Sequence, residues 1–280
     1  MPIRIAVLPA VLLLAGCGIA DKATLQWHAS TCLEGGVDPE EIAAACSSVI
    51  QGAKDDKELL RSAYRERAKV SYALGRKVQA LADHSKMIEL DPNDAVAYRD
   101  RGALRAELGD ISAAIKDLEA SARLDPTDPV PWFNMGVARS KVDDREGALA
   151  FNDKALKVQA DFMPAVANRC WLLAVLNRDL DQAGKACELA LQRDPQDSNT
   201  YNTRGFLHYR LGEFEAAIAD YDKSIAGDPK VGSSYYMRGM AKQALGRHDE
   251  AKADIAEGKK REASVAERYA SLGVDVPPVP

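Results

Sequence analysis

Apolar and small residues recur at three- and four-residue spacing in two successive segments between residues 198 and 231. The recurring positions are Tyr201, Arg204, Gly205, His208 and Leu211 in the first segment, and Ala217, Ile218, Tyr221, Ser224 and Ile225 in the second. This spacing predicts two helices that each bury one face. Gly212 lies between them, where glycine can adopt the left-handed conformation that ends a helix. Asp228-Pro229 closes the pair, because proline cannot continue a helix.

The same turn signal returns about every 34 residues. It appears at Gly75, Gly109, Asp143, Asn177, Gly212 and Gly246, so all spacings are 34 except one of 35. Asp and Asn are the other residues that adopt the left-handed conformation at modest cost. The residue that opens each second helix keeps the same period, at Ala80, Ala114, Ala148, Ala183, Ala217 and Ala251. The sequence therefore predicts six helical hairpins, with one residue inserted between Asn177 and Ala183.

This pattern resembles the tetratricopeptide repeat (TPR) family, whose unit is a 34-residue helix-turn-helix with a terminal proline. The resemblance covers residues 58–265, in six units at 61–94, 95–128, 129–162, 163–197, 198–231 and 232–265. It implies an all-α fold, a right-handed α-solenoid of stacked hairpins with a concave inner face. It also implies protein binding rather than catalysis.

Four units carry an arginine in the first helix and an aspartate sixteen residues later in the second. The pairs are Arg67 with Asp83, Arg101 with Asp117, Arg204 with Asp220, and Arg238 with Asp254. In the third unit both positions change together, to Met135 and Phe151. Folding the hairpin about its turn places the two positions opposite each other, which predicts partly buried structural ion pairs. The alternative is surface charges without a fixed partner, which contribute little to stability.

The first sixteen residues have one early cation, Arg4, and an apolar run from Ile5 to Leu14 that is too short to span a bilayer. Leu14-Ala15-Gly16-Cys17 resembles the bacterial lipobox. That resemblance implies cleavage of a signal peptide at 1–16, lipidation of Cys17 including a palmitate chain, and a membrane-anchored protein of the bacterial cell envelope. Gly18 in place of aspartate favours the outer membrane, facing the periplasm. The alternative is a simple secretory signal that happens to contain a cysteine.

Export gives the four other cysteines an oxidising environment, in which disulfides persist. Cys170 takes the place of Gly205 in its unit, and Cys187 takes the place of Tyr221, so we expect a Cys170–Cys187 disulfide. Cys32 and Cys46 bracket a Gly/Pro turn and are expected to form a second disulfide. The alternative is buried free thiols. No Cys-x-x-Cys or paired histidine accompanies them, so no metal site is predicted.

The segments outside the six units are less regular. Residues 17–57 are expected to form a tether and a divergent helical hairpin, with helices near 25–33 and 41–51. A solvating helix is expected near 262–272, and the chain ends in a cap and proline-rich tail at 266–280.

One stripe of the first helices lies opposite their buried face, and in the TPR family it lines the concave groove. From the third unit onward this stripe is rich in aromatic and apolar residues, which suit a peptide or protein partner. The candidate groove residues are Phe133, Val137, Trp171, Asn199, Asn202, Phe206, Tyr209, Tyr236 and Met240. Two alternatives are that Trp171 or Phe206 packs between helices, and that the terminal helix or tail fills the groove.

The 280-residue chain has a net charge of −5 and no basic stripe, so it is a poor candidate for nucleic-acid binding. It contains no catalytic or cofactor motif, so we expect neither an enzyme nor a cofactor. The resemblance to TPR proteins and to bacterial lipoproteins implies a membrane-tethered periplasmic scaffold that binds a protein or peptide partner in cell-envelope assembly or proteolysis. The alternative is a structural component that assembles through its ends without a groove ligand. The sequence leaves the partner's identity and the oligomeric state open.

Overall fold

A computed structural model of the chain describes residues 22–35, 38–53 and 55–274. These residues form fifteen helices and no strand. The helices are α1 (Lys22–Glu34), α2 (Pro39–Gly52), α3 (Lys57–Ala73), α4 (Lys77–Leu90), α5 (Ala95–Glu107), α6 (Ile111–Leu124), α7 (Val130–Ser140), α8 (Arg145–Val158), α9 (Met163–Val175), α10 (Leu180–Arg193), α11 (Ser198–Leu211), α12 (Phe214–Gly227), α13 (Gly232–Ala244), α14 (His248–Arg261) and α15 (Val265–Ser271). The predicted signal peptide, Cys17 and the last six residues lie outside the described part.

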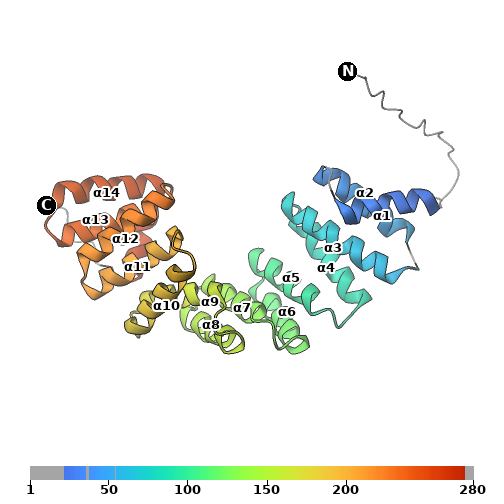
Figure 1. Cartoon of the computed structure of the whole chain (residues 1–280), viewed down its shortest axis with the longest axis horizontal. Helices are drawn as coiled ribbons and strands as arrows, with labels where there is room; N and C mark the ends of the chain where they lie inside the picture. Colours follow the sequence, from blue (N-terminus) through green and yellow to red (C-terminus); the bar gives the residue numbers. More distant parts are fainter. Residues whose placement is uncertain (1–21, 36–37, 54, 275–280) are drawn as a thin grey trace, which may run out of the picture. The chain divides into compact units, whose positions relative to one another are not determined.

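The chain divides into two compact units, residues 1–92 and 93–280. In the first, α1 packs on α2, α2 on α3, and α3 on α4. In the second, consecutive helices from α5 to α14 pair into five hairpins that pack one on the next, and α15 packs on α13 and α14 (Figure 1). The predicted all-α fold of stacked helix-turn-helix hairpins is confirmed.

The turns follow the predicted chemistry. Gly212 and the equivalent glycines have positive φ, and Asp143 and Asn177 take the same left-handed conformation at φ 60° and 50°. Asp179 is also left-handed, with φ 48°, immediately before α10. Asp179 lies between Asn177 and Ala183, the stretch in which the sequence predicts one inserted residue. The turn takes up this extra residue, so Ala183 holds the same place in α10 as the corresponding alanine does in the other second helices.

Small residues let the two helices of a hairpin approach closely. A Cβ placed on Gly205 would lie 2.9 Å from the Tyr221 ring, and one on Gly102 would lie 2.8 Å from Leu118. At such distances an added side chain would force the helices apart. The fourth unit has Cys170 at the glycine position, and the structure joins it to Cys187.

The terminal segments depart from the sequence-based expectation in one respect. The N-terminal hairpin forms as α1 and α2 and has a buried core that includes Cys32, Cys46 and Val49. The expected solvating helix, by contrast, is confined to α15, and its residues Val265 and Tyr269 are fully buried. Among the described residues, no helix combines the length and the apolar character needed to cross a bilayer.

Candidate functional site

The candidate groove residues lie on the first helices of four successive hairpins of the second unit, α7, α9, α11 and α13. They differ in exposure. Phe133, Val137 and Trp171, which we call the open stripe, are partly exposed. Aromatic neighbours hold two of them in place: the Phe133 ring meets Phe162 edge-on at 5.7 Å, and the Trp171 ring lies 5.7 Å from Phe206. The open stripe therefore presents ordered apolar side chains to solvent.

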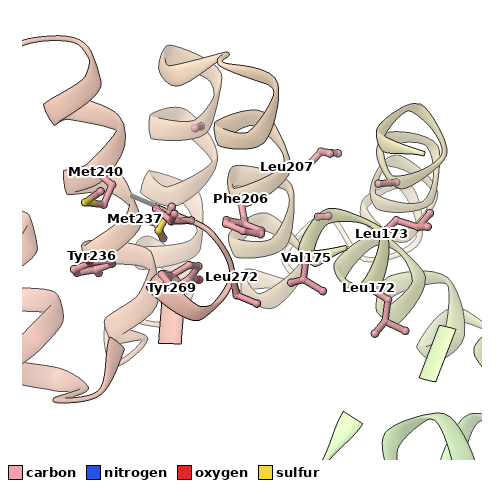
Figure 2. Close-up of a cluster of buried hydrophobic side chains, with 14 of the residues drawn as sticks. Leu172, Leu173, Val175, Phe206, Leu207, Tyr236, Met237, Met240, Tyr269 and Leu272 are labelled. Carbon is pink, nitrogen blue, oxygen red and sulfur yellow. The ribbon is translucent and has the colours of Figure 1, made fainter. Parts of the chain in front are cut away.

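The remaining apolar candidates, Phe206, Tyr236 and Met240, form what we call the covered stripe. Phe206 and Tyr236 are 0% exposed and Met240 is 1% exposed. The expectation that these three side chains are accessible to a partner therefore needs correction. They belong to the largest buried cluster of the second unit, shown in Figure 2.

Residues 265–274, which we call the C-terminal segment, cover this stripe. The Tyr269 ring lies between Phe206 and Tyr236, with ring centroids 5.4 and 5.9 Å away (Figure 2). Val265, Leu272 and Val274 are buried in the same cluster. This arrangement corresponds to the alternative in which the terminal helix fills the groove, rather than to a solvated helix. Val265, Tyr269 and Leu272 have the i, i+4, i+7 spacing of an apolar helix face.

Arg210 holds the end of this segment. Its guanidinium donates hydrogen bonds to the backbone carbonyls of Leu272 and Gly273, and it also lies over the Phe206 ring, 5.0 Å from the centroid. Burial lowers the pKa of Arg210 from its ordinary value. A cation at the C-terminal end of a helix satisfies the carbonyls that lack an intrahelical partner.

The polar candidates have separate environments. Asn202 is engaged within the protein, because its side chain donates to the Ser233 hydroxyl at 3.2 Å and accepts from Ser234 at 3.0 Å. Tyr209 is partly buried, with its ring edge-on to Phe214 at 5.5 Å. Asn199 is exposed at the start of α11. Of these three, Asn199 is the residue best placed to reach a partner.

The four predicted ion pairs are present within their hairpins. In each, the arginine Nε donates to one carboxylate oxygen of the aspartate and the arginine Nη2 donates to the other. The closest distances are 2.6 Å for Arg67–Asp83, 2.8 Å for Arg101–Asp117, 2.7 Å for Arg204–Asp220 and 2.6 Å for Arg238–Asp254.

These pairs are structural, because the aspartate of each is nearly or fully withdrawn from water. The pKa of Arg204 is raised, chiefly by its hydrogen bond to Asp220. Burial alone would raise the pKa of Asp254, but hydrogen bonds from Arg238 and Lys242 lower it below the ordinary value. An arrangement that keeps both groups charged stabilises the hairpin and leaves neither group free for chemistry.

The third and fourth units replace the ion pair differently. In the third, Trp132 stacks on Phe151 at 6.3 Å, and the Lys154 ammonium lies 4.7 and 4.9 Å from the two rings. In the fourth, Ala186 stands where the ion-paired hairpins have the aspartate, and Arg169 instead donates to Asp153 of the preceding hairpin at 3.0 Å. Sequence reasoning missed this inter-hairpin contact.

Both expected cysteine pairs are joined as disulfides, Cys32 to Cys46 and Cys170 to Cys187. No group of three or more His, Cys, Asp or Glu side chains suited to a metal occurs among residues 22–35, 38–53 and 55–274. The candidate lipidation site, Cys17, lies outside these residues.

A pocket of about 420 Å³ between α10 and α11 offers the strongest alternative site. Its charged lining includes Lys185, Glu188 and His208, and no serine, threonine or cysteine. His208 is already engaged, with Nδ1 2.6 Å from the Glu213 carboxylate. The residues that line the pocket therefore include no hydroxyl or thiol nucleophile.

Comparison with protein-family models gave matches described as tetratricopeptide repeat at residues 77–130, 198–230 and 232–263. A comparison with curated protein sequences gave no match.

Solved structures with the same fold include a tetratricopeptide repeat protein from Parabacteroides merdae ATCC 43184, which is 17% identical with a TM-score of 0.66. That alignment covers 90% of this chain and 98% of the other. MamA from Desulfovibrio magneticus RS-1 is 22% identical, with a TM-score of 0.54 and coverage of 61% and 96%. YrrB, described as a TPR protein with an unusual peptide-binding site, is 15% identical, with a TM-score of 0.53 and coverage of 68% and 98%.

These similarities agree with the sequence period of about 34 residues and with the observed stack of hairpins. The chain contains tetratricopeptide repeats, and its fold is that of solved tetratricopeptide repeat structures.

Proposed function

We propose that this protein is a scaffold that binds a protein or peptide partner through the open stripe of its second unit. One observation carries the proposal: the apolar side chains Phe133, Val137 and Trp171 remain partly exposed on the consecutive first helices α7 and α9. An exposed apolar patch of this kind usually marks an interaction site. Tetratricopeptide repeat folds commonly serve protein–protein interaction, and YrrB is described as having a peptide-binding site.

The second part of the proposal concerns location. We propose that the chain is exported, anchored through a lipid on Cys17, and held at the outer membrane facing the periplasm, where it serves envelope assembly or proteolysis. The lipobox-like Leu14-Ala15-Gly16-Cys17 supports this, and so do the two disulfides, since disulfides persist in oxidising compartments.

The third part is that the protein does no chemistry of its own. The ionisable groups of the ion pairs are held by structural partners, and no hydroxyl or thiol side chain lines the pocket between α10 and α11. An alternative function is a structural component that assembles through the ends or flanks of the stack.

Site-specific photo-crosslinking tests the binding surface. A photoreactive phenylalanine at position 137 lies on the open stripe, and the same group at position 189 is a matched control, because Leu189 is an exposed apolar residue on α10. We expect residue 137 to crosslink to a defined envelope protein and residue 189 not to do so. The adduct should disappear when Trp171→Ala and Phe133→Ala are added. Equal adducts at both positions, or adducts unaffected by these substitutions, would instead support assembly through the flanks.

Mass spectrometry of the membrane-extracted protein tests the anchor. We expect a mature N-terminus at Cys17 carrying acyl chains, and we expect Cys17→Ser to leave the protein unacylated and released from membranes. An unmodified Cys17 in the mature protein would contradict the anchor and leave the groove hypothesis standing.

A further inference from the structure

The C-terminal segment has the form of a ligand that the chain supplies to itself. Its helix α15 is seven residues long and follows α14 after only three residues, 262–264. One face carries Val265, Tyr269 and Leu272 at i, i+4 and i+7, and all three are buried against the covered stripe. The opposite face, including Glu267 and Ser271, is exposed. The segment therefore packs as a short amphipathic helix on an apolar surface.

The surface beneath the segment has two features that recognise such a helix. Phe206, Tyr236 and Met240 form an apolar floor with Met237 between them (Figure 2). At one end, Arg210 donates hydrogen bonds to the last carbonyls of the segment. An apolar floor selects the i, i+4, i+7 face, and a cation at the helix C-terminus fixes the direction of the bound helix.

The fit also contains a feature that opposes permanent docking. The Tyr236 hydroxyl is buried without a hydrogen-bond partner in the part of the chain that the structure describes. Burying a hydroxyl without a partner is unfavourable and offsets part of the gain from apolar burial. A seven-residue helix also has little intrinsic stability away from its docking surface. These features fit an occupant that exchanges rather than a fixed element of the core.

We propose that the covered stripe is a binding site for a short amphipathic helix of a partner protein. This helix carries an aliphatic residue, a tyrosine and a leucine at i, i+4 and i+7. The C-terminal segment occupies the site until the partner displaces it. The inference rests on the proposed scaffold function and identifies the chemical class of the partner. Release of the segment joins the covered stripe to the open stripe, because Phe206 already contacts Trp171.

A labelled peptide with the sequence of residues 262–274 is the probe, titrated into the full-length chain and followed by fluorescence anisotropy. Three forms of the chain are compared: wild type, Tyr269→Ala, which weakens the internal occupant, and Tyr201→Ala as a matched control. Tyr201 is a partly buried tyrosine of α11 whose hydroxyl binds the Pro195 carbonyl and which does not belong to the cluster under α15. We expect Tyr269→Ala to bind the peptide at least tenfold more tightly than wild type or Tyr201→Ala. A peptide that itself carries Tyr269→Ala should bind at least tenfold more weakly.

Equal affinities for the three forms, or peptide binding that ignores the tyrosine, would overturn the proposal. Hydrogen exchange on the wild-type chain provides a second measurement that needs no variant. We expect amides of residues 265–271 to exchange at least tenfold faster than the core amides of α13, because the segment opens on its own. Exchange of both at one common rate would show that α15 is a fixed part of the fold and would contradict the proposal. Crosslinking at residue 137 reports the open stripe separately, so failure here leaves that test intact.

Discussion

Two neighbouring pairs of hairpins in the second unit follow one repeat pattern. They differ in the contact that joins the two helices of each hairpin and in the exposure of the stripe on their first helices. In α11–α14, both hairpins contain an Arg–Asp pair, and the covered stripe of their first helices is buried under the C-terminal segment. In α7–α10, neither hairpin has such a pair, and the same stripe is partly exposed. An aromatic stack with Lys154 replaces the pair in one hairpin, and the Cys170–Cys187 disulfide staples the other.

This difference separates stability from accessibility. A hairpin needs some contact across its two helices, and an ion pair, an aromatic stack or a disulfide can each provide one. Whether the stripe is open depends instead on a segment from elsewhere in the chain. We therefore assign the hairpin contacts to folding and the stripe to binding, and the following predictions test that division, from the largest expected effect to the smallest.

Truncating one aromatic side chain in each of the two stripes should have unequal effects on stability. Phe206→Ala removes a fully buried ring and should lower the free energy of unfolding by about 3–5 kcal/mol. Phe133→Ala removes a partly exposed ring and should cost about 1 kcal/mol, while reducing crosslinking at residue 137. Urea denaturation monitored by circular dichroism measures both values. Equal losses would mean that the open stripe is as much a part of the core as the covered one.

Removing a buried ion pair should likewise cost more stability than removing a partly exposed one. Asp220→Ala leaves Arg204 partly buried without its bidentate partner and should cost about 3–5 kcal/mol. Asp153→Ala breaks a partly exposed contact to Arg169 between hairpins and should cost about 1 kcal/mol or less. The same urea experiment compares the two variants. A small loss for Asp220→Ala would assign hairpin stability to apolar packing alone.

The disulfide next to the open stripe should contribute on the order of 3 kcal/mol, because it closes a short loop. Replacing Cys170 and Cys187 together by serine removes it, and hydrogen exchange should then accelerate across α9 and α10. The matched control replaces Cys32 and Cys46, which lie in the first unit, and should leave exchange of α9 unchanged. Unchanged exchange of α9 without its own disulfide would show that packing alone holds this hairpin.

Alkaline pH should release the covered stripe before it affects the open one. Burial raises the pKa of Tyr269 to about 12, whereas an exposed tyrosine ionises near 10. Below pH 10 both states are neutral and docking is unaffected. Between pH 10 and 12 the undocked tyrosine loses its proton first, so each pH unit should cost docking about 1.4 kcal/mol.

Hydrogen exchange of α15 as a function of pH, corrected for the intrinsic rate, measures this effect. Tyr269→Phe is the control, because it keeps the ring and removes the ionising group. A pH dependence that is the same in both chains would assign the release to another group.

Much of the hairpin structure could be predicted, because residues that contact each other across a hairpin are always the same number of positions apart in the sequence. Arg204 and Asp220, sixteen residues apart about one turn, must face each other once the hairpin forms. The Cys170–Cys187 disulfide followed from the same argument, since the two cysteines occupy the positions of Gly205 and Tyr221 in the next unit. Helix ends were predictable for the same reason, because each turn carries a residue that accepts positive φ.

Contacts between one hairpin and the next could not be predicted from this separation. The pairing of Arg169 with Asp153 requires the offset between adjacent hairpins, which a single-hairpin argument does not contain. The position of α15 stayed open between a solvated helix and one that fills the groove, because the apolar face of a seven-residue helix does not indicate which surface it packs against. The burial of Phe206, Tyr236 and Met240 therefore depends on an element whose position the sequence left open between these two alternatives.

Hydroxyl-radical footprinting of the full-length chain tests the division between open and covered stripes most directly. In the wild-type chain we expect Phe133 and Trp171 to be labelled and Met240, Phe206 and Tyr236 to be protected. In Tyr269→Ala these last three should become labelled while α13 keeps its helical exchange protection. Continued protection of Met240 in that variant, or labelling of Met240 in the wild type at the rate of Trp171, would contradict the account.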